Sequence, residues 1–345
     1  MARILRRRHD RPRRRERWPL ALGLVLNLAL ILAACAPRLQ TPGPGPVIPY
    51  FDGDRMVMAD GDRRPFRQWL PAGDGRPRAV VIALHGFGDH GQAFETVGAA
   101  LAARGIAVMA PDQRGFGRSR ARGIWPGGRA LVTDLAALTR LVAARYPGRP
   151  IFVLGESMGG AVALVARAEG LPVAGVILVA PAVWGRASMP RWQVGALDFF
   201  VRLVPWLPLD PSATGKRASD NLAMLRALGR DPLFIRHPRL DTVWGLVNLM
   251  DAAAAAADGL DPPLLLLLGA RDEIVPRPPI CQMLADLPRR PGTVRRLYPD
   301  GHHMLLRDLA GARVIADIAA WIGGAALPPL PAPTTTGFCA DVKGR

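Results

Sequence analysis

The pentapeptide Gly155-Glu156-Ser157-Met158-Gly159 follows directly after the apolar run 151–154. A strand that ends in such a turn forces the serine into a strained backbone conformation, and the flanking glycines avoid collisions with the neighbouring strand and helix. The alanine-rich stretch 159–168 that follows is compatible with a helix. Strand, sharp turn and helix in this order predict that the Ser157 hydroxyl stands clear of a sheet edge, as a nucleophile must.

Apolar runs alternate with helix-length stretches along most of the chain. The pattern predicts buried strands at 79–84, 106–110, 151–154, 176–180, 264–268 and 294–298, and helices at 92–103, 130–144, 159–168, 280–287 and 305–322. This alternation predicts an α/β fold in which a mostly parallel central sheet is covered by helices on both faces. In such sheets the ligand crevice lies beyond the carboxyl ends of the strands.

Polar residues follow the predicted strands at that edge. Asp272 comes after the run 264–268, and His302 and His303 come after 294–298. A serine hydroxyl needs an imidazole to take its proton and a carboxylate to orient that imidazole, so Ser157, Asp272 and a histidine form a candidate catalytic set. The backbone N–H groups of Phe87 and Met158 are the candidate oxyanion donors.

Other readings of these residues stay open from the sequence. Ser157 could be a simple turn residue, and Asp272 could cap a helix, although three prolines intervene before position 280. Glu273 is a neighbouring rival carboxylate, and either adjacent histidine could face the serine. His90 and His237 belong to no such set, so we expect ordinary loop residues there.

Several motifs together resemble the monoacylglycerol lipase and lysophospholipase branch of the α/β-hydrolases, over roughly residues 56–322. They are Ala59-Asp60-Gly61, His85-Gly86-Phe87-Gly88-Asp89-His90, the segment 112–119, Gly155-Glu156-Ser157-Met158-Gly159-Gly160, the segment 269–276 and the segment 298–308. The resemblance implies a cofactor-independent serine ester hydrolase. It selects His303 over His302. A helical lid is expected from the residues themselves, because 182–241 interrupts the alternation of strands and helices.

The same resemblance assigns supporting roles to several residues, and the chain departs from the animal members of the branch at one position. It implies that His85 holds the oxyanion loop and that Asp112, Arg114 and Ser119 brace a loop without a catalytic part. Glu156 stands where animal members commonly have histidine, and no role follows for it. The branch also includes general esterases and thioesterases and is similar to proline iminopeptidases, which gives a serine aminopeptidase as the alternative enzyme.

The N-terminal segment resembles a bacterial lipoprotein signal peptide. An arginine-rich start precedes an apolar stretch at 20–34, which is short for a bilayer span, and Leu32-Ala33-Ala34-Cys35 is similar to a lipobox. The resemblance implies that Cys35 is acylated and that the protein is membrane-anchored in the cell envelope. Because Ala36 is not an inner-membrane retention aspartate, sorting to the outer membrane is a hypothesis; an uncleaved anchor is the alternative.

We therefore expect six segments. They are a signal peptide at 1–34, a lipidated Cys and a Pro/Gly-rich tether at 35–50, a hydrolase core at 51–181 and 242–325, a lid insertion at 182–241 and a disordered tail at 326–345. An apolar helical face at 196–204 in the lid could either pack on the core or form an acyl-chain tunnel and membrane-docking surface.

Charge and cysteine usage narrow the function classes. The formal charge of +17 comes from arginine, since Lys216 and Lys343 are the only lysines, and no nucleic-acid motif accompanies it. The charge fits a basic protein surface that faces anionic lipid headgroups better than it fits nucleic-acid binding. No zinc spacing occurs, and we expect no cofactor. Whether Cys281 and Cys339 pair stays open, as does a non-catalytic envelope lipoprotein on a hydrolase scaffold.

Overall fold

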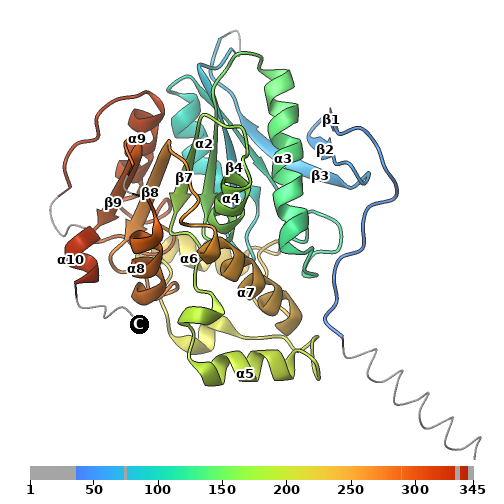
Figure 1. Cartoon of the computed structure of the whole chain (residues 1–345). Coiled ribbons are helices and arrows are strands. Elements are labelled where there is room, and N and C mark those ends of the chain that lie inside the picture. The colour runs from blue at the N-terminus through green and yellow to red at the C-terminus, as the bar shows by residue number, and fades with distance from the viewer. Residues whose placement is uncertain (1–35, 74–75, 289, 331–334, 341–345) are drawn as a thin grey trace, which may run out of the picture.

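The computed structural model of the protein describes residues 36–73, 76–288, 290–330 and 335–340 (Figure 1). Its centre is a nine-stranded sheet of order β1-β2-β3-β5-β4-β6-β7-β8-β9. The first three strands pair antiparallel, and β3 pairs antiparallel with β5. From β5 to β9 every pairing is parallel. The strands are β1 (Tyr50–Asp52), β2 (Arg55–Val57), β3 (Arg63–Trp69), β4 (Ala79–Leu84), β5 (Ile106–Pro111), β6 (Ile151–Glu156), β7 (Gly175–Val179), β8 (Leu264–Gly269) and β9 (Thr293–Tyr298).

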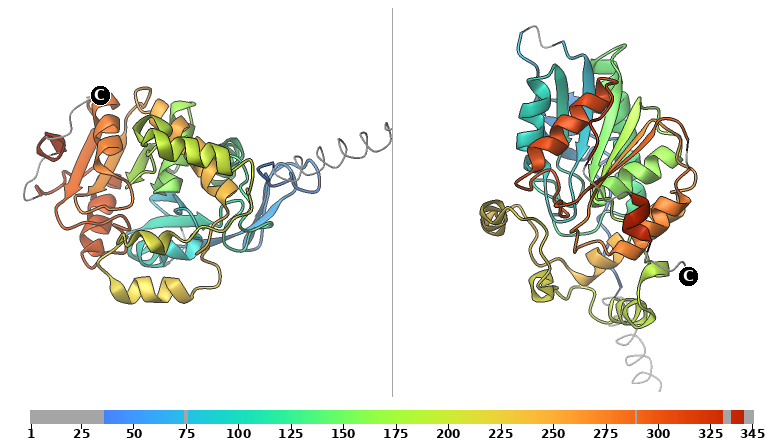
Figure 2. Two further views of the ribbon diagram at one scale, coloured as in Figure 1. Left: turned by 90° about the horizontal axis from the view of Figure 1, so that it is seen from below. Right: turned by 90° about the vertical axis from the view of Figure 1, so that its left-hand side faces the viewer.

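Helices cover both faces of the parallel strands (Figures 1 and 2). Side chains of a strand alternate between the faces, so Val80 and Ile82 of β4 join one apolar cluster and Val81 joins the other. The first cluster includes α3 (Gly128–Arg145), α4 (Met158–Ala168), α7 (Leu240–Ala255) and α8 (Arg277–Asp286). The second includes α2 (Glu95–Ala102), preceded by the 3₁₀ turn η1 (Gly91–Phe94), and α9 (Gly311–Ile322). The predicted mostly parallel sheet with two covered faces is confirmed.

Helices α8 and α9 begin at other residues than we predicted, each for a local reason. Helix α8 starts at Arg277 rather than at 280, because prolines in the first turn of a helix lose no intrahelical hydrogen bond. Helix α9 starts at Gly311 rather than at 305. The intervening residues form a loop in which Asp308 accepts a hydrogen bond from the His302 N–H, and Leu305 and Leu306 are buried.

Residues 182–241 leave the sheet after β7 and form a separate layer at the end of the molecule (Figure 1). They contain η2 (Arg186–Ser188), α5 (Arg191–Phe200), η3 (Pro211–Thr214) and α6 (Leu222–Arg230), and α7 returns the chain to the sheet. Helix α5 has no buried residue, and Trp192 and Phe199 are 72% and 59% exposed. The apolar face predicted at 196–204 is therefore divided between the two alternatives: Leu197 packs against the first apolar cluster and Val201 is buried, whereas Phe199, Phe200 and Leu203 are exposed.

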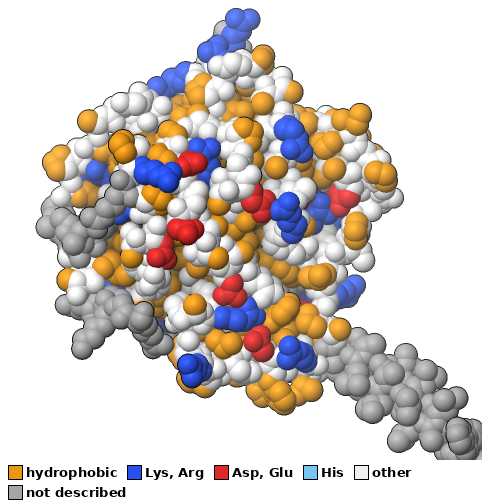
Figure 3. Space-filling model, in the orientation of Figure 1, with side chains coloured by type: hydrophobic (Ala, Val, Ile, Leu, Met, Phe, Trp, Pro, Cys, Tyr) orange, Lys and Arg blue, Asp and Glu red, His pale blue; other side chains and the backbone are white. Residues whose placement is uncertain are grey.

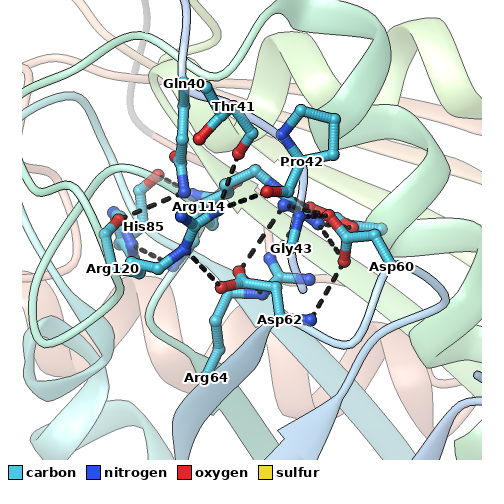
Figure 4. Close-up of polar contacts among 12 residues, drawn as sticks. Gln40, Thr41, Pro42, Gly43, Asp60, Asp62, Arg64, His85, Arg114 and Arg120 are labelled. Carbon is cyan, nitrogen blue, oxygen red and sulfur yellow. Dashed lines mark hydrogen bonds and ion pairs between the residues drawn. The ribbon is translucent and has the colours of Figure 1, made fainter. Parts of the chain in front are cut away.

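The segment that we predicted to be an extended tether is docked onto the core along residues 38–47, which we call the N-terminal strap (Figure 4). The Gln40 N–H donates to the Trp125 carbonyl at 2.8 Å, and the Gly43 N–H donates to Asp60 Oδ2 at 2.8 Å. Only glycine fits at position 43, since a Cβ there would lie 2.3 Å from the Asp60 carbonyl oxygen. Proline and glycine content alone suggested a free linker, but these backbone contacts hold it.

The C-terminal segment is also more ordered than we predicted. Helix α10 (Thr335–Cys339) lies beside α8, and a disulfide joins Cys281 to Cys339. Leu327 and Leu330 pack against the second apolar cluster. The open question of this cysteine pair is therefore settled in favour of a bond. The predicted signal peptide and Cys35 lie outside the described residues, within which no helix is long and apolar enough to cross a bilayer.

Candidate active site

The serine of the pentapeptide stands at the turn between β6 and α4. Ser157 has φ 52° and ψ −114°, a strained conformation for a residue with a side chain. Its N–H donates to the Val179 carbonyl at 2.9 Å, and its own carbonyl accepts from the Ala161 and Ala182 N–H groups at 3.0 Å each. A Cβ at Gly159 would lie 2.1 Å from the Leu84 carbonyl oxygen. The turn thus requires glycine at position 159. Three backbone hydrogen bonds stabilise the strained conformation of Ser157, which presents its hydroxyl to the site.

The structure brings the three predicted polar residues together at the carboxyl ends of their strands. Ser157 Oγ lies 2.9 Å from His303 Nε2, and His303 Nδ1 lies 2.8 Å from Asp272 Oδ2. The other carboxylate oxygen, Asp272 Oδ1, accepts the N–H groups of Ile274 and Val275 at 2.8 and 3.1 Å. Asp272 is therefore fixed in its loop and caps no helix.

The environment of His303 favours its protonated form. Burial lowers the pKa of His303, but the charge of Asp272 and its hydrogen bond raise it more, so the pKa lies above its ordinary 6.5. His302 does not reach the serine: its backbone N–H donates to Asp308 Oδ2 at 2.7 Å. Glu273 likewise faces away, since it accepts the Arg217 N–H at 2.7 Å.

Phe87, the second predicted oxyanion donor, lies in the turn that follows β4. Among the described residues, neither the Phe87 N–H nor the Met158 N–H donates to a protein acceptor. His85 is fully buried and accepts the Gln113 N–H at Nε2, 3.0 Å away, so its Nδ1 carries the proton and donates to the Gly86 carbonyl at 2.8 Å. Burial lowers the pKa of His85, which keeps it neutral for this task. His85 holds the turn, as the resemblance implied.

A second loop is braced by Asp112 and Arg114, as predicted, whereas the Ser119 hydroxyl is buried and has no hydrogen-bond partner among the described residues. Asp112 accepts the N–H groups of Gly91 and Arg118 at 2.8 and 2.7 Å. Arg114 bridges Asp60 and Asp134 at 2.6 and 3.0 Å, and Figure 4 shows this cation beneath the N-terminal strap. Burial raises the pKa of Asp60, but hydrogen bonds from Arg114 and from the backbone lower it far below its usual range.

Two site features escaped the sequence reasoning. Glu156, for which no role could be assigned, is 2% exposed and lies 3.3 Å from an Arg307 nitrogen, measured to Oε2. His90 is no ordinary loop residue, because it is buried and its Nε2 lies 2.9 Å from Asp231 Oδ2 in the lid. Neither pair has a sequence spacing that would predict it.

One cluster has the residue types of a metal site. Asp220, His302 and Asp308 each place one atom within 4.8 Å of the others. Asp308 already accepts the Ser219 hydroxyl at 2.6 Å, and Asp220 accepts the Leu309 N–H at 2.9 Å. These bonds explain the cluster as a junction between the lid and the histidine loop.

The chain is similar to known lipases. The family described as serine aminopeptidase, S33, matches residues 75–310. Human monoglyceride lipase is 30% identical over 301 residues, which cover 82% of this chain and 96% of that protein. Monoacylglycerol lipase of Mycolicibacterium smegmatis is 27% identical and covers 76% of this chain and 93% of its own. A soluble variant of monoglyceride lipase from Saccharomyces cerevisiae, solved in complex with a substrate analogue, superposes with a TM-score of 0.66 at 20% identity, over 83% and 97% of the two chains.

Proposed function

The chain belongs to the serine aminopeptidase S33 family and is a carboxylic ester hydrolase with the α/β-hydrolase fold, and from this premise we propose that it cleaves monoacylglycerols or lysophospholipids through an acyl-enzyme on Ser157. The observation that carries the proposal is the unbroken hydrogen-bond chain from Ser157 through His303 to Asp272. It has the connectivity that activates a serine hydroxyl.

The proposed reaction has two halves. Ser157 Oγ attacks the ester carbonyl carbon while His303 Nε2 takes the hydroxyl proton, and the Phe87 and Met158 N–H groups stabilise the oxyanion. When the tetrahedral intermediate collapses, His303 returns the proton to the leaving alcohol and the acyl-enzyme remains. Water then attacks the acyl carbon by the same proton path, which releases the fatty acid and restores Ser157.

The lid favours an ester over a peptide with a free amine. An aminopeptidase of this type needs lid carboxylates for the substrate amine, and residues 182–241 contain five aspartates and no glutamate. Every one of these aspartates already has a hydrogen-bond partner. The pairs are Asp198 with Arg186, Asp210 with Ser212, Asp220 with the Leu309 N–H, Asp231 with His90, and Asp241 with Arg239. The relatives named as monoglyceride lipases point to the same substrate class.

We further propose that Cys35 is acylated and that the protein works on the surface of an envelope membrane. The strap supports this, because the Arg38 N–H donates to Asp241 Oδ2 at 3.1 Å and the Asp241 N–H donates to the Pro205 carbonyl at 3.0 Å. Arg38 is thus linked through Asp241 to Pro205, the residue before Trp206, which is 49% exposed. The three residues from Cys35 to Arg38 span at most about 10 Å, so the acylated end would lie near this part of the lid. Apolar side chains gather at this end of the molecule, over α5 (Figure 3).

The test of the enzymatic proposal is a substrate panel with a serine variant. The protein should hydrolyse monoacylglycerols or lysophospholipids, and the Ser157→Ala variant should lose both hydrolysis and fluorophosphonate labelling, with Ser212→Ala, an exposed serine of η3, as the matched control. Wild-type turnover by Ser157→Ala would overturn it. The anchor is tested separately: Cys35→Ser should lose incorporated fatty acid and move the protein out of the membrane fraction.

A further inference from the structure

A single buried arginine joins two carboxylates next to the candidate triad. One Arg307 guanidinium nitrogen lies 2.7 Å from Asp89 Oδ2 and 3.3 Å from Glu156 Oε2. The Arg307 side chain is 12% exposed, and the two carboxylates are 3% exposed each. We call these three residues the Arg307 bridge.

The bridge connects the three loops that assemble the site. Asp89 lies in the turn after β4 that contains Phe87, which we call the oxyanion turn, and its Oδ1 accepts the His90 N–H at 2.9 Å. Glu156 immediately precedes Ser157, and Arg307 lies in the loop of His303, where its N–H donates to the Met304 carbonyl at 2.8 Å. The bridge therefore spans the ends of β4, β6 and β9, from which the oxyanion donor, the nucleophile and the base come.

The bridge is not arranged as a stability device. Glu156 Oε1 and Arg307 Nε are buried and have no hydrogen-bond partner among the described residues. Buried ion pairs with unmet hydrogen bonds commonly stabilise a fold no better than apolar residues of the same size. A role in the reaction accounts better for their position.

The charges around His303 indicate what that role is. The Asp272 and Glu156 carboxylates favour an imidazolium at His303, and the Arg307 cation opposes it. Asp89 and Asp308 act in turn on Glu156: burial raises the pKa of Glu156, both aspartates raise it further, and Arg307 and His303 lower it. With two carboxylates on one guanidinium, the bridge carries one surplus negative charge when Glu156 is ionised.

We propose that Glu156 and Arg307 are positioning residues for the triad: the bridge fixes the oxyanion turn after β4, the turn at Ser157 and the histidine loop relative to one another, and the Glu156 carboxylate, when ionised, stabilises the imidazolium that His303 becomes in the transition state. The inference rests on the proposed function, because it needs His303 to act as the base. It gives a task to the residue at which this chain departs from its animal relatives.

The decisive experiment is the pH dependence of kcat/KM in the Glu156→Gln variant, measured with a soluble short-chain ester. The variant keeps the shape of the side chain and removes its charge. His303 should then lose its proton at lower pH, so the acid limb of the profile should shift to lower pH. The plateau should fall about five-fold, because the imidazolium loses one favourable charge.

A matched control separates this effect from general damage. Asp317 is also a buried carboxylate paired with an arginine: it lies 3.0 Å from an Arg296 nitrogen and accepts the Tyr298 hydroxyl at 2.6 Å. The strongest charges acting on His303 are those of Asp272, Glu156 and Arg307, and Asp317 is not one of them. Asp317→Asn should leave the acid limb in place. If the wild type is active and the folded Glu156→Gln variant shows the same acid limb as the wild type, the bridge proposal is wrong. The proposed function is untouched by that result.

The geometric part is tested at Arg307. Arg307→Met should lower kcat on the order of 10- to 100-fold, with KM for the short ester changed by less than about three-fold, because misplaced groups lose turnover rather than binding. Arg307→Lys should recover part of the loss, since lysine restores the charge without the fork. If both variants fold and keep wild-type kcat, the bridge does not position the triad.

Discussion

Replacing Asp272 by asparagine should abolish the basicity of His303 through a tautomer change that the loop itself enforces. The loop fixes Asp272 Oδ1 as the acceptor of the Ile274 and Val275 N–H groups, at 2.8 and 3.1 Å. An asparagine must keep its oxygen there, so its NH₂ group turns toward His303 Nδ1, where the carboxylate oxygen now lies at 2.8 Å. Nδ1 must then accept, which places the ring proton on Nε2, facing Ser157 Oγ.

In that tautomer His303 cannot take the serine proton. The equivalent change in a serine protease triad costs about 10⁴-fold in kcat, or about 5.5 kcal/mol of barrier. We expect a loss of that order here, with an unchanged KM, from steady-state rates on a short-chain nitrophenyl ester. Fluorophosphonate labelling of Ser157 should slow in parallel.

Glu273 offers the control, because it is the neighbouring acid but binds the Arg217 N–H rather than the histidine. Glu273→Gln should keep kcat within about three-fold of wild type, as surface substitutions usually do. If Asp272→Asn retained kcat within ten-fold of wild type, the tautomer argument would be wrong and another carboxylate would have to orient His303.

Three further outcomes follow from the structure. Because the pKa of His303 is raised, its base form is lost as pH falls, and the acid limb of kcat/KM in the wild type should centre above pH 6.5. Replacing Cys281 and Cys339 by serine removes a cross-link between positions 58 residues apart, which should cost about 4 kcal/mol in urea unfolding; a loss under about 1 kcal/mol would contradict the chain-entropy reasoning. Gly159→Ala should prevent stable folding, because its Cβ would lie 2.1 Å from the Leu84 carbonyl oxygen; a soluble variant with native circular dichroism and melting temperature would refute this.

The sequence was sufficient for the parts of the site that local pattern determines. Ser157, Asp272 and His303 each follow an apolar run, and the carboxyl ends of parallel strands meet at one edge of a sheet. The strands were predicted for the same reason: runs such as 79–84 are buried on both faces and read as continuous apolar segments.

The contacts between distant loops could not be predicted in this way. Arg307 meets Asp89 across 218 positions, and His90 meets Asp231 across 141. Side-chain ion pairs between loops follow neither the period of a helix nor that of a strand, so no spacing marks them. The N-terminal strap was misjudged for a related reason: apart from the Gln40 side chain, it is held through its backbone N–H and carbonyl groups, which carry no sequence signal, and their partners lie in other segments.

Part of the arginine content is buried in ion pairs and does not contribute to the surface charge. Arg64, Arg114 and Arg296 are 2%, 6% and 7% exposed, and each faces a carboxylate, so these charges cancel inside the domain. The first 17 residues hold nine arginines against two acidic residues, a net +7 of the total +17. Because internal pairs remove charges of both signs equally, the remaining surplus of +10 must reside on groups outside those pairs. A net positive charge on a domain that also exposes apolar side chains of α5 suits an anionic lipid headgroup layer, and this agrees with the proposed anchor at Cys35 better than with nucleic-acid binding.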